Sequence, residues 1–394
     1  MLLTGCQPSQ APFVPTLTAT FTSTPPPTFA STIAPIPTST PTATPKPTAV
    51  PEALPANLTS DIDAAAKGVL DRLLLPGLTL AIRYGSRPVY IKGYGYANIT
   101  TSTPAQANTI YEIGSITKQF TAAAIMQLVE RGKLGLDDPV SKFLPDYPKP
   151  GRSVLIRQLL NHTSGIPNYT DLAATQQVSV DLARAHTPEE VMTFFKDLPL
   201  EFTPGTQWRY SNSGYFLLGV IIERVTGLTY PEYVQRNIFT PLGLASTSYC
   251  IPSLPELAQG YQSSADGKLQ SVPWVHSSFF YAAGGICSTV GDLIKWQRAL
   301  AEGRVVSADS YRKMITPATL PDGKPLTYGY GLGVDVQDGR TVISHAGQTP
   351  GFSGGLIYYP DNDLAVAVLT NSDQGIRAQD VLEWVITNTL LLTP

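Results

Sequence analysis

The pattern of apolar and polar positions predicts strands near both ends of the chain and helices between them. A helix is expected over residues 59–75, and strands are expected at Leu78–Tyr84 and Val89–Tyr96, where β-branched and aromatic residues are frequent. Between about 115 and 300, apolar residues recur at helical spacing. The helices predicted there are Thr117–Arg131, Glu189–Lys196, Gly214–Thr226 and Val290–Ala301.

Strands return toward the C-terminus. They are predicted over residues 328–336 and 341–370, with Phe352–Tyr359 and Leu364–Leu369 as two of them, and a last helix is expected near 376–391. Hairpins at both ends with helices between them predict an α/β fold. Its antiparallel sheet would be built from both chain ends, flanked by helices, and interrupted by a mostly helical inserted part.

The beginning of the chain has a different composition. Residues 8–51 hold 12 prolines and 12 threonines in 44 positions, and Lys46 is their only charge. Such a segment cannot bury enough apolar surface to fold. We therefore expect residues 1–57 to form a disordered Thr/Pro-rich tether and residues 58–394 to form the folded domain.

Leu3-Thr4-Gly5-Cys6 resembles a bacterial lipobox, in which the cysteine receives a lipid. Only five residues precede Cys6, fewer than a complete signal region needs. Together with the adjoining tether, the segment favours an extracytoplasmic lipoprotein held at the membrane through Cys6, and a chance cysteine in a disordered terminus is the alternative. No later run of about 18 apolar residues predicts a transmembrane helix.

The charge, the histidines and the cysteines restrict the functional class of the protein further. A formal charge of −3 and a pI near 5.8 give no sign of nucleic-acid binding. The four histidines form no ligand cluster, so neither a metal nor another cofactor is expected. Cys250 and Cys287 could pair in an exported protein or remain free thiols, and the sequence leaves both possibilities open.

Candidate chemistry begins at Ser115-Ile116-Thr117-Lys118. The predicted helix starts here, so Ser115 would lie at a helix N-terminus and Lys118 one turn later on the same side. A serine hydroxyl needs a neighbour to take its proton, and a buried lysine can lose its own proton and act as that base. Alone, the same motif also fits an N-cap serine beside a solvated lysine.

Two further motifs complete a possible site. Tyr210 and Asn212 lie in a polar loop before an apolar helix. Near a cationic lysine, Tyr210 could be drawn toward the phenolate and shuttle protons. The alternative is a tyrosine that only packs and an asparagine that only caps the helix. His345 and Gly347 lie in a predicted strand whose open edge could bind an extended peptide. A structural role for His345 is equally open.

These motifs resemble the family of class C serine β-lactamases, D-alanyl-D-alanine carboxypeptidases, D-aminopeptidases and related esterases. The resemblance extends over about Leu58 to Leu391. It rests on Glu112–Lys118, Tyr210–Tyr215 and His345–Gly351, with secondary signatures at Leu159–Gly165 and Leu134–Val140.

The resemblance implies a role for each matching residue. Ser115 would be the acylated nucleophile, Lys118 and Tyr210 would share the proton transfers, and Asn212, His345 and Gly347 would contact substrate. The backbone N–H groups of Ser115 and Gln348 would form the oxyanion hole, and His162 is a weaker candidate in a structural turn. It also implies an α/β part at about 58–114 and 301–394 beside a helical part at about 115–300, with the site between them.

One departure narrows the substrate. Class C β-lactamases carry a lysine where this chain has His345, and histidine is mostly neutral at pH 7. A D,D-peptidase, D-aminopeptidase-like or esterase activity is therefore favoured over a class C-like β-lactamase. The expected substrates are D-amino-acid peptides, esters or β-lactams, and a catalytically silent peptidoglycan-binding or sensor protein is the alternative outside enzymes. The loops Thr170–His186 and Ile251–Ser277 are expected to shape the pocket.

Overall fold

The computed structural model describes residues 53–174, 180–264 and 267–373. Three predictions therefore lie outside the described residues: a lipid on Cys6, the Thr/Pro-rich tether over 8–51, and the helix near 376–391. Within the described part, no helix is both long and apolar enough to span a bilayer.

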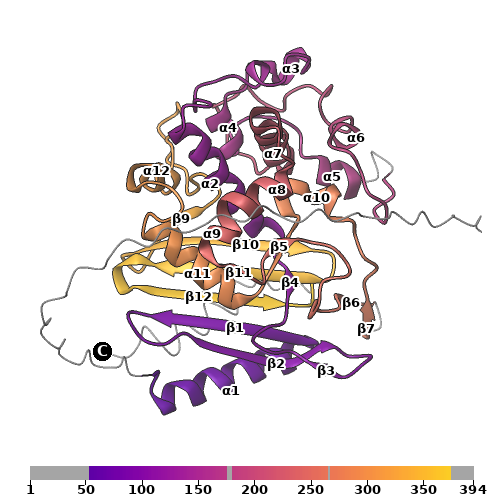
Figure 1. Cartoon of the computed structure of the whole chain (residues 1–394), viewed down its shortest axis with the longest axis vertical. Helices are drawn as coiled ribbons and strands as arrows, with labels where there is room; N and C mark the ends of the chain where they lie inside the picture. The colour runs from indigo at the N-terminus through magenta and orange to yellow at the C-terminus, as the bar shows by residue number, and fades with distance from the viewer. Residues whose placement is uncertain (1–52, 175–179, 265–266, 374–394) are drawn as a thin grey trace, which may run out of the picture. The chain divides into compact units, whose positions relative to one another are not determined.

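A seven-stranded antiparallel sheet has the order β3-β2-β1-β12-β11-β10-β9. The central pair joins the two ends of the domain, with Leu78 opposite Thr370 and Tyr84 opposite Leu364. The predicted α/β class with a sheet built from both chain ends is thereby confirmed (Figure 1). The strands are β1 Gly77–Tyr84, β2 Tyr90–Asn98, β3 Thr103–Pro104, β9 Gly333–Gln337, β10 Arg340–Thr349, β11 Phe352–Tyr359 and β12 Leu364–Thr370.

The strand predicted over 328–336 begins late, because β9 starts only at Gly333. Gly331 explains the delay: its φ is 72°, and a Cβ there would lie 2.6 Å from the carbonyl oxygen of Lys118. The backbone thus bends closely around the helix that carries Lys118, a path that only glycine allows without strain.

Each face of the sheet packs against a different set of helices, because side chains alternate along the strands. Leu78, Leu80 and Ile82 of β1 pack with helix α1 (Ala56–Leu73) in one apolar cluster. The opposite face meets α11 (Val290–Ala301) and shares the large core of the helical part. In Figure 1, α1 and α11 accordingly lie on different sides of the strands.

The helical part surrounds α2 (Thr117–Glu130), whose residues Thr117–Leu128 are all buried. Predicted Glu189–Lys196 is shorter in the structure, because Phe194 and Phe195 donate to carbonyls three residues back and tighten the chain after α6. The remaining helices are η1 Gly114–Ile116, η2 Val140–Lys142, α3 Lys149–Arg152, α4 Ile156–Leu160, α5 Tyr169–Ala174, α6 Pro188–Met192, α7 Asn212–Thr226, α8 Tyr230–Val234, η3 Gln235–Phe239, α9 Thr240–Leu242, α10 Ser277–Gly284, α12 Ala308–Met314 and η4 Pro360–Asn362.

A three-stranded sheet connects distant parts of the helical region. Its strands are β4 (Tyr111–Glu112), β8 (Ile286–Ser288) and β5 (Ser248–Tyr249), in the order β4-β8-β5, and a separate hairpin joins β6 (Tyr261–Ser263) to β7 (Leu269–Ser271). A disulfide between Cys250 and Cys287 joins the end of β5 to β8, which answers the question that the sequence left open. Since β4 leads directly into η1, this small sheet holds the segment that carries Ser115.

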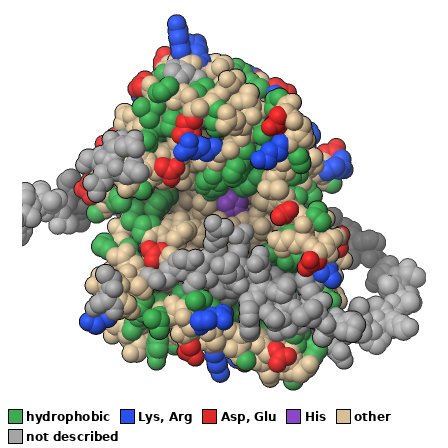
Figure 2. Space-filling view, turned by 180° about the vertical axis from the view of Figure 1, so that it is seen from behind, with side chains coloured by type: hydrophobic (Ala, Val, Ile, Leu, Met, Phe, Trp, Pro, Cys, Tyr) green, Lys and Arg blue, Asp and Glu red, His purple; other side chains and the backbone are tan. Residues whose placement is uncertain are grey.

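The face of the molecule shown in Figure 2 carries acidic and basic side chains interspersed with one another. On the described part of this face they do not separate into large patches of one sign. The dispersed charge agrees with the small net charge of −3.

Candidate active site

The structure places Ser115 in the η1 turn directly before α2, so Ser115 and Lys118 stand on the same side of one helical turn. Lys118 Nζ lies 2.9 Å from Ser115 Oγ. The Lys118 side chain is fully buried, and this burial lowers its pKa well below the usual 10.5. Burial thus disfavours the charged form of the amine that lies next to the hydroxyl.

Two other groups fix the orientation of this amine. Lys118 Nζ donates to Asn212 Oδ1 at 2.7 Å and to the carbonyl oxygen of Ala283 at 2.8 Å. A neutral amine has two N–H groups and one lone pair, and both of these partners can only accept. In this neutral form, the lone pair faces Ser115, the one partner that has a proton to give. The contacts thus prearrange transfer of the serine proton to lysine.

Asn212 keeps its oxygen toward the lysine because other residues hold its amide. Asn212 Nδ2 donates to Thr170 Oγ1 at 2.8 Å, and the Thr170 hydroxyl in turn donates to Asn168 Oδ1 at 3.1 Å. The backbone N–H of Asn212 donates to the same Asn168 oxygen at 2.9 Å. The sequence indicated Asn212 but not these two supporting residues, because their loop carries no motif of its own.

The Ala283 carbonyl reaches the lysine because α10 is kinked. Tyr281 lies inside this helix with φ 46° and ψ −130°, a strained conformation for a non-glycine residue. The carbonyls that follow it both turn toward α2: Ala282 accepts from Thr121 Oγ1 at 2.7 Å, and Ala283 accepts from Lys118. Backbone strain at Tyr281 is therefore coupled directly to the orientation of the base.

Tyr210 joins the site from the loop before α7. Lys118 Nζ lies 4.8 Å from the centre of its ring. Burial raises the pKa of the Tyr210 phenol, and a hydrogen bond with Ser115 only partly opposes this effect. The expected shift toward phenolate is therefore wrong, because burial disfavours the charged form of the phenol. Tyr210 is a neutral phenol that can donate a proton.

Strand β10 offers an open edge to this cluster. β9 pairs with β10 only from Arg340 to Ser344, so residues 345–349 have β11 on one side and no described strand on the other. The turn after β10 closes with Thr349 opposite Phe352, and the alternation of an antiparallel ladder then directs the N–H and C=O of Gln348 to the open side.

Two glycines bring Gln348 close to Ser115. A Cβ on Gly114 would lie 2.6 Å from the Gln348 backbone nitrogen. A Cβ on Gly347 would collide with the carbonyl oxygen of Ile113 and lie 3.0 Å from the Ser115 nitrogen. The backbones therefore pack directly on each other, which brings the two segments that carry the predicted oxyanion donors close together. Gly347 serves this contact, and it does not line the cavity that contains Ser115.

His345 lies behind the open edge. Its Nδ1 is 2.6 Å from the Ala346 carbonyl oxygen, and its Nε2 is 2.7 Å from the Tyr328 hydroxyl. The ring is buried, and this burial lowers the pKa of His345 to about 3. His345 is neutral at pH 7, and its predicted contact with substrate would require the ring to change partners.

His162, the weaker candidate, packs beneath Tyr210. The two ring centres are 4.3 Å apart, and His162 Nδ1 accepts from the backbone N–H of Ser211 at 3.2 Å. Its backbone φ of 61° belongs to a tight turn. Burial lowers the pKa of His162 well below 6.5, so a neutral ring supports the loop that carries Tyr210.

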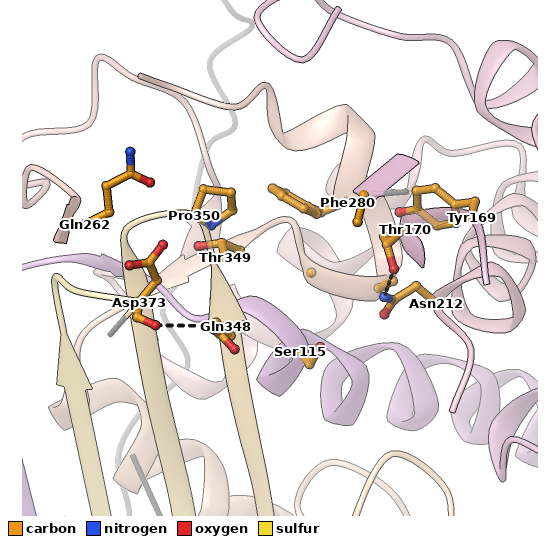
Figure 3. Close-up of a pocket in the computed structure, with 13 residues that line it drawn as sticks. Ser115, Tyr169, Thr170, Asn212, Gln262, Phe280, Gln348, Thr349, Pro350 and Asp373 are labelled. Atoms are coloured by element: carbon orange, nitrogen blue, oxygen red, sulfur yellow. Dashed lines mark hydrogen bonds between the residues drawn. The ribbon is translucent and has the colours of Figure 1, made fainter. Parts of the chain in front are cut away.

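A cavity of about 550 Å³ opens beside Ser115. Both loops expected to shape the pocket contribute to it, through Thr170 and Ala174 and through Gln262 (Figure 3). Lys118, Tyr210 and His345 lie outside its lining. The lining residues are Ser115, Tyr169, Thr170, Ala174, Asn212, Gln262, Phe280, Ala283, Gly284, Gln348, Thr349, Pro350 and Asp373.

The described residues contain no group of three or more His, Cys, Asp and Glu side chains arranged to hold a metal ion.

Glu112 is a titratable residue whose role the sequence did not indicate. It lies in β4 with 6% of its surface exposed and lines a second cavity of about 220 Å³, which shares Pro350 with the first. Burial raises the pKa of its carboxyl to about 7. The carboxyl thus titrates near neutrality, two positions before the pair of backbones that holds the oxyanion donors.

The Glu112→Gln variant is expected to remove a pH-dependent loss of stability. Between the ordinary pKa of 4.5 and the folded value of about 7, the folded state binds more protons than the unfolded state. The stabilising contribution of the carboxyl is therefore complete below pH 4.5 and is lost as the pH rises through 7. Relative to wild type, Glu112→Gln should gain about 3 kcal/mol in free energy of unfolding across this range.

Urea unfolding at several pH values measures this difference, and contributions of other groups such as His345 cancel between variant and wild type. Glu256→Gln, a change at an exposed glutamate, is the matched control and should follow the wild-type curve. Parallel curves for Glu112→Gln and wild type would contradict the assigned titration.

Comparison with known proteins agrees with this fold. The Beta-lactamase family model matches residues 62–391. Penicillin-binding protein 4* of Bacillus subtilis (strain 168) is 32% identical over 321 residues, covering 77% of this chain and 70% of that protein. D-aminopeptidase of Gluconobacter oxydans (strain 621H) is 26% identical over 317 residues, covering 80% of this chain and 59% of that protein, so less than two-thirds of its length.

A solved structure extends the similarity. The D-amino acid amidase from Ochrobactrum anthropi SV3, complexed with L-phenylalanine amide, superposes with a TM-score of 0.72 and 27% identity, covering 83% of this chain and 98% of that chain. The fold and the site define a serine hydrolase. The chain belongs to the beta-lactamase family, which confirms the family that the three motifs predicted.

Proposed function

We propose that this protein cleaves amide or ester bonds through an acyl-enzyme on Ser115, and that its substrates carry a D-amino acid residue on the acyl side. The observation that carries the proposal is the set of three contacts at Lys118. Two acceptor-only partners take its N–H groups and leave its lone pair facing the Ser115 hydroxyl. The preference for D-residues draws its support from the relatives named D-aminopeptidase and D-amino acid amidase.

In the acylation step, Lys118 takes the hydroxyl proton while Ser115 Oγ attacks the substrate carbonyl carbon. The negative charge that forms on the carbonyl oxygen is stabilised by the N–H groups of Ser115 and Gln348. When the tetrahedral intermediate breaks, the leaving amine or alcohol takes a proton from the Tyr210 phenol, which regains one from the lysine ammonium. Burial favours the neutral forms of Lys118 and Tyr210, and these forms suit this order of transfers.

Deacylation repeats this chemistry with water as the attacking group and Ser115 Oγ as the leaving group. A water molecule gives a proton to Lys118 and attacks the acyl carbon, and Ser115 Oγ leaves with the returned proton. Asn212 holds the amine in place during both steps, because its own amide is held by Thr170. Each of these residues holds its own position in the site, so the role of each can be tested by a separate substitution.

Trapping the acyl-enzyme tests this proposal. The purified protein is incubated with a fluorescent penicillin and with p-nitrophenyl butyrate, quenched in acid and analysed by mass spectrometry. We expect one added acyl group on the peptide that contains Ser115, and faster release of p-nitroaniline from D-alanine p-nitroanilide than from its L-enantiomer. Label on another residue would contradict the mechanism, and neither label nor turnover across the panel would favour a silent binding protein.

A further inference from the structure

Asp373 is the one charged residue among the described residues that line the Ser115 cavity. No lysine or arginine of the described chain contributes to this lining. Lys118 lies outside the cavity lining and is fully buried, and this burial disfavours its charged form. In the described part of the cavity wall, a substrate therefore meets a carboxylate without a competing cation.

The backbone around Asp373 is held firmly after β12. Asn371 is fully buried, and its Nδ2 donates to the carbonyl oxygens of Tyr96, Ala97 and Gln259 at 3.1, 3.1 and 2.9 Å. The Ser372 carbonyl accepts from Ser353 Oγ at 2.8 Å. These contacts with separate segments position Asp373 before any substrate arrives.

Asp373 is also joined to the strand that bears the oxyanion donor. Its backbone carbonyl accepts from Gln348 Nε2 at 3.1 Å. Figure 3 draws its carboxylate on the β10 side of the cavity, close to Thr349 and Pro350 and across from Asn212 and Thr170. The carboxylate and the backbone of Gln348 thus lie on the same side of Ser115.

Antiparallel pairing then identifies the substrate atom that would lie nearest to the Asp373 carboxylate and the Gln348 backbone. A residue that donates its N–H to a partner's carbonyl accepts the N–H of that same partner with its own carbonyl. If the Gln348 N–H holds the scissile carbonyl oxygen, the Gln348 C=O faces the amino nitrogen of the same acyl residue. This nitrogen is an amide in a longer peptide and an ammonium in a residue with a free amino group.

We propose that Asp373 makes the site selective for substrates whose acyl residue has a free amino group. The ammonium would donate to the Gln348 carbonyl, and the Asp373 carboxylate would balance its charge. This inference rests on the proposed acyl-enzyme at Ser115 and deepens it: the substrate class is an amino-acid amide, an amino ester or the amino end of a peptide. Substrates that bring a carboxylate, including β-lactams and peptide C-termini, are disfavoured by repulsion.

The test compares D-alanine amide with N-acetyl-D-alanine amide, which differ in the ammonium. Binding is measured by calorimetry in the Ser115→Ala background, which removes turnover, and kcat/KM is measured for both with otherwise wild-type protein. Asp373→Asn keeps the shape and removes the charge, and Asp146→Asn, at an exposed aspartate, is the control. A charge-assisted hydrogen bond predicts a ratio of free amine to acetylated ligand that falls about tenfold to a hundredfold in Asp373→Asn.

Asp146→Asn should leave this ratio unchanged, and Asp373→Lys should reverse the preference toward succinyl-D-alanine amide. An unchanged ratio in Asp373→Asn, or a wild-type preference for the acetylated ligand, would overturn the inference. Hydrolysis of neutral p-nitrophenyl butyrate separates the two proposals. If this ester still acylates Ser115 while the ratio does not respond, only the selectivity assigned to Asp373 fails; if it does not, the acyl-enzyme itself fails.

Discussion

Replacing Ser115 with alanine is expected to lower kcat for D-alanine p-nitroanilide by roughly four to six orders of magnitude. The variant keeps the two N–H groups of the oxyanion hole but has no oxygen to form the acyl-enzyme. End-point and steady-state assays measure the loss in kcat, and mass spectrometry should find no acyl group on the protein. Thermal unfolding should stay close to wild type, because the half-buried side chain loses a single oxygen.

Ser86→Ala, a change in the exposed turn after β1, is the matched control and should retain full activity. Retention of a tenth or more of the wild-type rate by Ser115→Ala would place the nucleophile elsewhere.

The Lys118→Met variant should lower kcat/KM by about a hundredfold to ten-thousandfold, the usual contribution of a general base. Methionine fills a similar volume without a lone pair, so acylation should suffer far more than folding. Lys142→Met, at an exposed lysine that pairs with Asp138, removes an amine elsewhere and should change little.

The pH dependence of wild-type kcat/KM gives an independent signature. The neutral amine is the active form, so activity should be present above the lowered pKa of Lys118 and be lost as the pH falls through it. In Lys118→Ala, added ethylamine should restore part of the rate, and more at high pH where more of it is unprotonated. A rate that does not depend on Lys118, or rescue that is independent of pH, would remove lysine from the mechanism.

Much of the fold was accessible from local patterns. The predicted strands Leu78–Tyr84 and Phe352–Tyr359, where apolar and aromatic residues are frequent, match β1 and β11 closely. Val290–Ala301 matches α11 for the analogous helical reason. Where prediction failed, as at residues 328–332 before β9, the chain responds to a distant segment, here the carbonyl of Lys118.

The candidate site, like the fold, was predictable from the sequence only where neighbouring residues decide the geometry. Ser115 and Lys118 are one helical turn apart, so local geometry alone predicts that they meet. Tyr210 and Asn212 came from a motif, but the direction of the Tyr210 pKa did not, because that depends on how deeply the tertiary structure buries the phenol. Thr170 and Asp373 carry no local signal.

Sequence therefore specified which groups are present and which of them share a turn or a strand face, because these relations depend on neighbours a few positions away. Tertiary packing decided the lowered pKa of Lys118, the partners that orient its amine and the charge of the described cavity wall. The carbonyl of Ala283 is 165 positions from Lys118 along the chain. Such contacts, and the exclusion of water that lowers the lysine pKa, exist only once helix and sheet have closed around the same core.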